Sequence, residues 1–239
     1  MTTARTARTE RASTTQEAIL AAAERLFAEH GVFAVSNRQV SEAAGQGNNA
    51  AVGYHFGTKT DLVRAIEHKH RAPIEQLREE MVADLGDSAD MRDWVACLVR
   101  PLTEHLAALG SPTWYARFAA QVMTDPAYHN IFVKDALRSP SLVQVIDGIN
   151  SCLPELSIDV RVERNVMARN LLVHTCADHE RARARGVRKL GVAERSGTPP
   201  LNTGASVPRR SWHDAASGLI DAIVGLWLAP VTPLEGSCR

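Results

Sequence analysis

Thr58 and Lys59 form the part of the chain best suited to hold an anion. Threonine is a preferred first residue of a helix, and the free backbone N–H groups of a helix start attract phosphate. Lys59 adds a positive charge at that start. The pair predicts a contact to a phosphate oxygen, the kind of contact that positions a protein on nucleic acid without reading its sequence.

The spacing of the residues gives little support for a dinucleotide, metal or catalytic site. Residues 45–50 fit the dinucleotide fingerprint G-x-G-x-x-A, but that fingerprint requires a preceding strand, and a helical pattern precedes it here. The pairs His68–His70 and His174–His179 have poor spacing for metal binding on a helix, and the four cysteines are far apart. The sequence carries no HExxH, P-loop or G-x-S-x-G motif. We expect no cofactor, no metal and no enzymatic activity.

Two short helical runs precede Thr58 and surround a glycine-containing turn. Ser36 and Gln39 have the spacing of a capping box, and Gly45 ends the first run. Either Asn48 or Asn49 can cap the second run, which ends near Phe56. This layout is that of a helix-turn-helix, in which one helix braces the second against the major groove. After Thr58 we expect a longer helix that Pro73 kinks or interrupts.

The N-terminal segment resembles the tetracycline-repressor (TetR/AcrR) family of transcription regulators over about residues 14–66. The resemblance is carried by Arg38, Val40, Ala44, Gly45, Tyr54, His55, Phe56, Lys59 and Leu62. It implies a homodimer that binds double-stranded DNA, with Tyr54, His55 and Lys59 on phosphates. The stretch from Gly45 to Phe56 is one residue longer than the common pattern, and Gly53 lacks a side chain, which shifts base reading toward the turn. Asn can pair with adenine, yet a plain helix cap is an equal alternative for either Asn. The candidate DNA-binding residues are Arg38, Gln39, Gln46, Asn48, Asn49, Tyr54, His55 and Lys59.

The rest of the chain has helical apolar spacing, so the sequence predicts an all-α fold. We expect a disordered basic arm over 1–13, a three-helix DNA-binding domain over 14–60, and a larger helical ligand-binding and dimerisation domain over 61–228. Residues 186–210, rich in Gly and Pro, read as a loop, and 229–239 as a tail.

The larger domain is expected to hold a small apolar ligand and to form the dimer. The candidate ligand-binding residues are Trp94, His105, Trp114, Tyr115, Phe118, Met123, Met167 and His174, for each of which ordinary core packing is the competing interpretation. The apolar stripe of the last helix and the matching face of the helix expected over 159–184 predict a dimer interface of four helices, two from each subunit. Its residues are Leu219, Ile220, Ile223, Val224 and Trp227. A helical ligand-binding protein or enzyme that uses the same pocket, and a helix-turn-helix that binds only protein, are the alternatives.

The charge distribution agrees with DNA contact at the N-terminal end. Residues 1–71 carry nine Lys and Arg against seven Asp and Glu, whereas residues 72–180 carry nine against sixteen. The acidic middle would repel DNA, and the basic stretch near 181–210 is a lesser candidate for contact. With no long apolar run, we expect no signal peptide or membrane partner and a cytoplasmic protein.

Overall fold

All regular structure in the described part of the chain is α-helical, which confirms the all-α fold. The computed structural model is described for residues 2–48, 50–136, 138–153, 155–196 and 211–231. The helices are α1 (Thr2–His30), α2 (Asn37–Ala43), α3 (Ala51–Phe56), α4 (Lys59–Leu85), α5 (Met91–Ala108), α6 (Tyr115–Thr124), α7 (His129–Ala136), α8 (Pro140–Ser151), α9 (Ile158–Ser196) and α10 (Trp212–Leu228). None of these described helices is long and apolar enough to cross a membrane.

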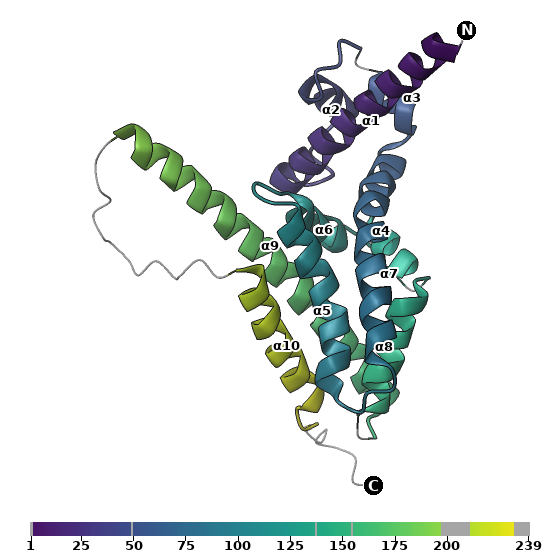
Figure 1. The fold of residues 1–239 in the computed structure, drawn as a ribbon, viewed down its shortest axis with the longest axis vertical. Coiled ribbons are helices and arrows are strands. Elements are labelled where there is room, and N and C mark those ends of the chain that lie inside the picture. The colour runs from purple at the N-terminus through teal and green to yellow at the C-terminus, as the bar shows by residue number, and fades with distance from the viewer. Residues whose placement is uncertain (1, 49, 137, 154, 197–210, 232–239) are drawn as a thin grey trace.

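Helices α1, α2 and α3 form a small unit at one end of the molecule, and α4 leads from it into a larger bundle (Figure 1). A shared apolar core holds the small unit together, with Phe27, Val40 and Val52 fully buried. The expected capping box at Ser36 and the expected cap at Thr58 are both present. Ser36 Oγ accepts from Gln39 N, and Thr58 Oγ1 accepts from Asp61 N. These caps fix where α2 and α4 begin.

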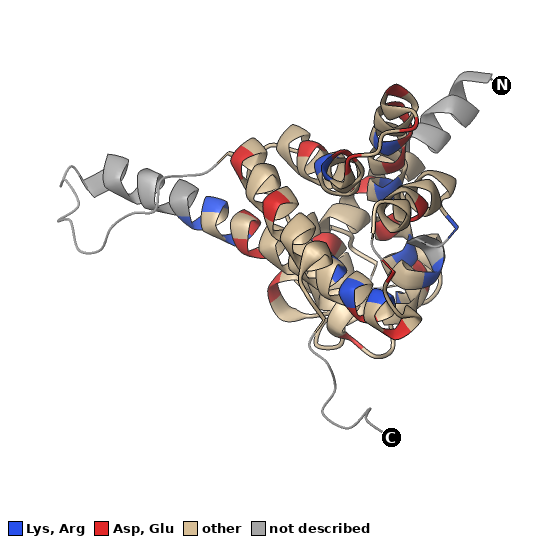
Figure 2. Ribbon diagram, turned by 90° about the horizontal axis from the view of Figure 1, so that it is seen from below, with Lys and Arg blue, Asp and Glu red and all other residues tan. Residues whose placement is uncertain are grey.

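The larger bundle is arranged around α5, which packs against α4, α8 and α10 (Figure 1). Helix α6 lies between the two units because it contacts both α1 and α9. Acidic and basic residues are interspersed over the described helices (Figure 2). The fold therefore joins the two units through α4 on one side and through α1 and α6 on the other.

Two expected helix boundaries are wrong. Helix α1 begins at Thr2 rather than Thr14, because residues 2–13 contain no Gly or Pro to stop it. Helix α9 continues to Ser196 through much of the expected 186–210 loop; single glycines among Ala, Arg and Leu do not end a helix. Residues 197–210 and 232–239 lie outside the described residues.

Helix α4 also passes through Pro73 without interruption. A proline inside a helix costs about 3 kcal/mol through a lost hydrogen bond and a steric clash. Here Ile66, His70, Ile74 and Val82 bury one face of α4 on both sides of the proline. The packing of that face offsets the local cost, so a single helix connects the two units.

Candidate nucleic-acid interface and internal cavity

The second helix of the helix-turn-helix, α3, buries one end and exposes the other. Ala51 and Val52 pack into the core, whereas Gly53 and Tyr54 face outward. Tyr54 is 81% exposed and its ring meets that of His55 edge-on, with 5.0 Å between centroids. A Cβ added at Gly53 would meet no atom within 4 Å. An exposed aromatic next to open surface is suited to contact a partner.

Lys59 and Arg38 border this surface, and each already has a partner. Lys59 Nζ donates to the carbonyl oxygen of Val32 at 3.1 Å, which ties the start of α4 to the connection between α1 and α2. The ammonium retains further donors for a phosphate. Arg38 Nε donates to Glu42 at 2.7 Å, and both side chains are largely exposed. An exposed pair of this kind contributes little to stability and can be exchanged for a phosphate at small cost.

The polar side chains around the turn mainly stabilise the turn itself. Gln39 completes the Ser36 capping box by accepting from Ser36 N at 2.8 Å, and Gln46 donates to the carbonyl oxygen of Ala44 at 3.1 Å. Asn48 Oδ1 accepts from Ala50 N at 2.9 Å, just before α3. Asn49 lies outside the described residues. This bond stabilises the turn and does not cap α3, because the residue that precedes α3 is Ala50 and α3 has no side-chain cap.

Comparison with known families agrees with this geometry. Residues 19–66 match the family described as "Bacterial regulatory proteins, tetR family". Residues 19–66 therefore form a DNA-binding domain of the TetR family, which supports a role as a DNA-binding transcription regulator. A search of curated proteins found no match. The matched segment runs from α1 through the first turns of α4 and includes both helices of the helix-turn-helix.

The larger domain contains a cavity of about 430 Å³ that is partly open to solvent. That volume is within the range of small-molecule sites. Seven helices, α4 to α10, contribute to it. The residues that line it are Glu67, Arg71, Ile74, Glu75, Arg78, Leu98, Leu102, Tyr115, Ala116, Ala119, Met123, Phe132, Val133, Ser139, Leu142, Ile146, Ile149, Asn165, Ala168, Arg169, Leu172, Val173, Cys176 and Trp227.

Only two of the expected ligand-binding residues, Tyr115 and Met123, are among those that line this cavity. Of the aromatics outside it, Phe118 is fully buried between Phe27 and Phe132, in line with the core-packing interpretation. The Trp94 ring covers Gly148, and the Trp114 ring faces the Arg117 guanidinium at 4.4 Å.

The remaining three expected residues also lie elsewhere. Met167 and His174 are exposed on the surface of α9. His105 is buried in a polar cluster between the two units. Sequence periodicity shows which residues face inward, but it does not show which inward residues leave a space between them.

His105 belongs to a buried hydrogen-bonded chain that reaches the DNA-binding unit. His70 Nδ1 lies 2.8 Å from His105 Nε2, and His70 Nε2 donates to Glu24 of α1 at 2.9 Å. Burial raises the pKa of Glu24, but the His70 hydrogen bond and the His70 and Lys69 charges together lower it, so Glu24 is an ionised acceptor. Burial and the His70 charge lower the pKa of His105 to about 4. Tyr115 stacks on His70 at 3.9 Å and also lines the cavity.

The buried cysteine of the cavity is an unreactive thiol. Burial and the Glu180 charge raise the pKa of Cys176 to about 12. The thiolate needed to attack an electrophile is therefore scarce at neutral pH. No group of three or more potential metal ligands occurs among the described residues.

The stripe expected to form the dimer is buried within one protomer instead. Leu219, Ile220, Ile223 and Trp227 belong to the core, where α10 packs on α5 and α9, and only Val224 is partly exposed. The prediction that this stripe forms the dimer interface does not fit this packing, because α5, a helix distant in sequence, covers the stripe. Exposed apolar residues lie on α9 instead, and they are Ile158, Val162, Val166 and Met167.

Proposed function

We propose that this TetR-family protein is a cytoplasmic repressor that binds a pseudo-palindromic operator as a homodimer. A small, mainly apolar molecule in the cavity would release it from DNA. The observation that carries the proposal is the shared helix α4, whose first residues belong to the helix-turn-helix and whose later turns line the cavity. One rigid element in contact with both sites provides a physical route for coupling.

Phosphate contacts by Tyr54, His55 and Lys59 are part of this proposal. Exposed Tyr54 and half-buried His55 lie near the end of α3, and Lys59 starts α4 three residues after Phe56, the last residue of α3. The Thr58 cap orients the start of α4, where Lys59 adds charge to the helix N-terminus. These three residues would set the register of α3 on DNA, whereas base reading falls to the turn before it.

The homodimer would use the outer face of α9. Val162, Val166 and Met167 are exposed apolar residues at helical spacing on that face, and Leu228 is exposed at the end of α10. A second copy would remove this apolar surface from water and give two DNA-binding units related by a two-fold axis. That arrangement matches the symmetry of a pseudo-palindrome.

The buried chain from Tyr115 through His70 to Glu24 supports the coupling step. It joins the cavity wall on α6, the connecting helix α4 and the DNA-binding helix α1 through contacts of 3.9 Å or less. A ligand that displaces Tyr115 would disturb these buried hydrogen bonds. Effects of about 1–3 kcal/mol on DNA affinity are typical of such coupling.

The test is selection of bound sites from random duplex DNA with the full chain, followed by measurement of Lys59→Ala. Loss of one phosphate contact should weaken all selected sites similarly and reduce the salt dependence by about one charge equivalent. Lys134→Ala, an exposed lysine on α7, is the matched control and should change neither quantity. Thermal unfolding must accompany the assay because Lys59 also bonds Val32. A folded Lys59→Ala protein with unchanged affinity and salt dependence contradicts the assignment.

A further inference from the structure

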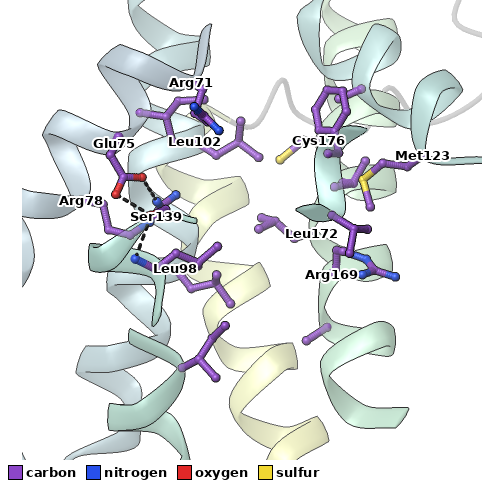
Figure 3. Close-up of a pocket in the computed structure, with 18 of the residues that line it drawn as sticks. Arg71, Glu75, Arg78, Leu98, Leu102, Met123, Ser139, Arg169, Leu172 and Cys176 are labelled. Atoms are coloured by element: carbon purple, nitrogen blue, oxygen red, sulfur yellow. Dashed lines mark hydrogen bonds and ion pairs between the residues drawn. The ribbon is translucent and has the colours of Figure 1, made fainter. Parts of the chain in front are cut away.

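The charged residues of the cavity are concentrated on one wall. Helix α4 presents Glu67, Arg71, Glu75 and Arg78 to it, and the other helices contribute mostly apolar side chains. Figure 3 shows Arg71, Glu75 and Arg78 together on one side, with Arg169, Leu172 and Cys176 on the opposite side. A ligand in this space would meet a polar group mainly at α4.

Glu75 is saturated by groups of the protein. Its Oε1 accepts from the hydroxyls of Ser139 and Ser141, each at 2.5 Å, and its Oε2 accepts from Arg78 Nη1 at 2.6 Å. These bonds hold the carboxylate in place at the start of α8. Glu75 therefore has little capacity left to accept hydrogen bonds from the other N–H groups of Arg78.

Arg78 is only 8% exposed, and its Nε is buried without a hydrogen-bond partner among the described residues. A guanidinium carries five N–H donors. Burial lowers the pKa of Arg78 despite the opposing effect of Glu75, so the charge is incompletely compensated. Arg169 Nε and Trp227 Nε1, also from residues of the cavity wall, are likewise buried without a described partner. All three unsatisfied atoms are donors, so the buried polar atoms of the cavity wall have donors in excess of acceptors.

The charges of the wall decide between neutral and ionised acceptors. Three arginines stand against two glutamates among the lining residues. Arg71 lies 3.8 Å from Glu67 and Arg78 2.6 Å from Glu75, whereas Arg169 has no ion pair with a described residue. The ionised side chains that line the cavity therefore carry one positive charge in excess. A bound monoanion neutralises this excess charge, whereas a bound monovalent cation doubles it, which is unfavourable in a poorly solvated space.

We propose that the cavity binds an apolar monocarboxylic acid and that Arg78 holds its carboxylate. A carboxylate is an acceptor-only group that matches the planar guanidinium, and the apolar walls accommodate the hydrocarbon part. The inference rests on the proposed function in taking the cavity as the effector site. It adds that the ligand's charged group binds α4, the helix that begins at the DNA-binding unit.

The test compares three probes of equal chain length: octanoate, 1-octanol and octylammonium. Binding to the full chain at pH 7.5 is followed by the fluorescence of Trp227 and the other tryptophans, and by calorimetry, below micelle-forming concentrations. Octanoate should bind about ten- to a hundredfold more tightly than octanol, as expected for a charge-assisted hydrogen bond, and octylammonium should bind most weakly. Octanol binding equal to or tighter than octanoate binding overturns the proposal, and this comparison needs no variant.

The variant Arg78→Gln locates the carboxylate. It should remove the preference for octanoate and leave octanol affinity unchanged. Arg64→Gln is the matched control, because it breaks an exposed i,i+3 pair of the same helix, 3.3 Å from Asp61, outside the cavity. A folded Arg78→Gln protein that keeps the octanoate preference overturns the role of Arg78.

Operator affinity is measured separately with each probe. Failure of the acid preference with intact DNA binding refutes only the ligand class. Tight octanoate binding that leaves DNA affinity unchanged refutes the regulatory function and leaves the ligand class standing.

Discussion

Replacing His105 with glutamine should remove an acid sensitivity from the fold. In the native protein His105 is buried and has a pKa of about 4, against an ordinary value of 6.5. The unfolded chain therefore binds a proton at this residue between pH 6.5 and 4 that the folded chain does not bind. Because the pKa is lowered on folding, the contribution of neutral His105 is complete above pH 6.5 and is lost as the pH falls toward 4. The glutamine amide can still form a hydrogen bond with His70, as donor or as acceptor, but it does not titrate.

The magnitude follows from the two pKa values. Each pH unit in this window changes the free energy of unfolding by about 1.4 kcal/mol per proton, so the whole effect is about 3 kcal/mol. Between pH 6.5 and 5 the share of His105 is about 2 kcal/mol. Glu24 has a pKa below its ordinary 4.5, so its own contribution is lost only below this interval.

The assay is urea unfolding followed by tryptophan fluorescence at pH 6.5 and pH 5. The native protein should lose about 2 kcal/mol more than His105→Gln across that interval. His68→Gln, an exposed histidine of α4, should behave as the native protein does. Equal losses in the native protein and His105→Gln would refute the assignment of a neutral, buried His105.

Two further predictions concern packing. Gly148→Ala places a Cβ 2.2 Å from the Trp94 ring, so it should destabilise the protein by about 1–3 kcal/mol, measured by thermal unfolding; Gly53→Ala, with open space around it, should not. Val166→Glu should give folded monomers in sedimentation, whereas Ile223→Asp buries a charge in the core and should unfold the protomer; a dimeric Val166→Glu protein would contradict the proposed interface.

Local patterns predicted the DNA-binding unit well. The Ser36–Gln39 capping box and the Thr58 cap depend on residues close in sequence, and the apolar core of α1, α2 and α3 follows helical periodicity. The start of α1 was not predictable in this way. Thr14 and Glu17 also have the spacing of a capping box, yet they lie inside one continuous helix. A capping-box pattern shows where a helix can begin. The helix begins there only if residues that disfavour a helix, such as Gly or Pro, precede it.

The cavity and the covering of α10 depend on contacts between distant residues. Glu75 attracted no notice in the sequence, yet it anchors Ser139 and Ser141 and positions Arg78. Likewise, the stripe containing Ile223 was evident, but the identity of the helix that covers it was not. The sequence did contain one signal for the role of Glu75. An acid on the inward face of an amphipathic helix needs hydrogen-bond or charged partners.

Glu180 makes the two sides of the cavity unequal in stiffness. From α9, its buried carboxylate accepts from Thr113 Oγ1, from the backbone N–H groups of Ala116 and Arg117, and from Arg117 Nε, all at the start of α6. Sliding α6 along α9 would break several of these bonds at once and leave a charge unpaired in the interior, so intermediate positions are costly. The α6–α9 side should therefore resist displacement. A ligand that widens the cavity would displace the other helices that line it, α4 among them, more readily than it would separate α6 from α9.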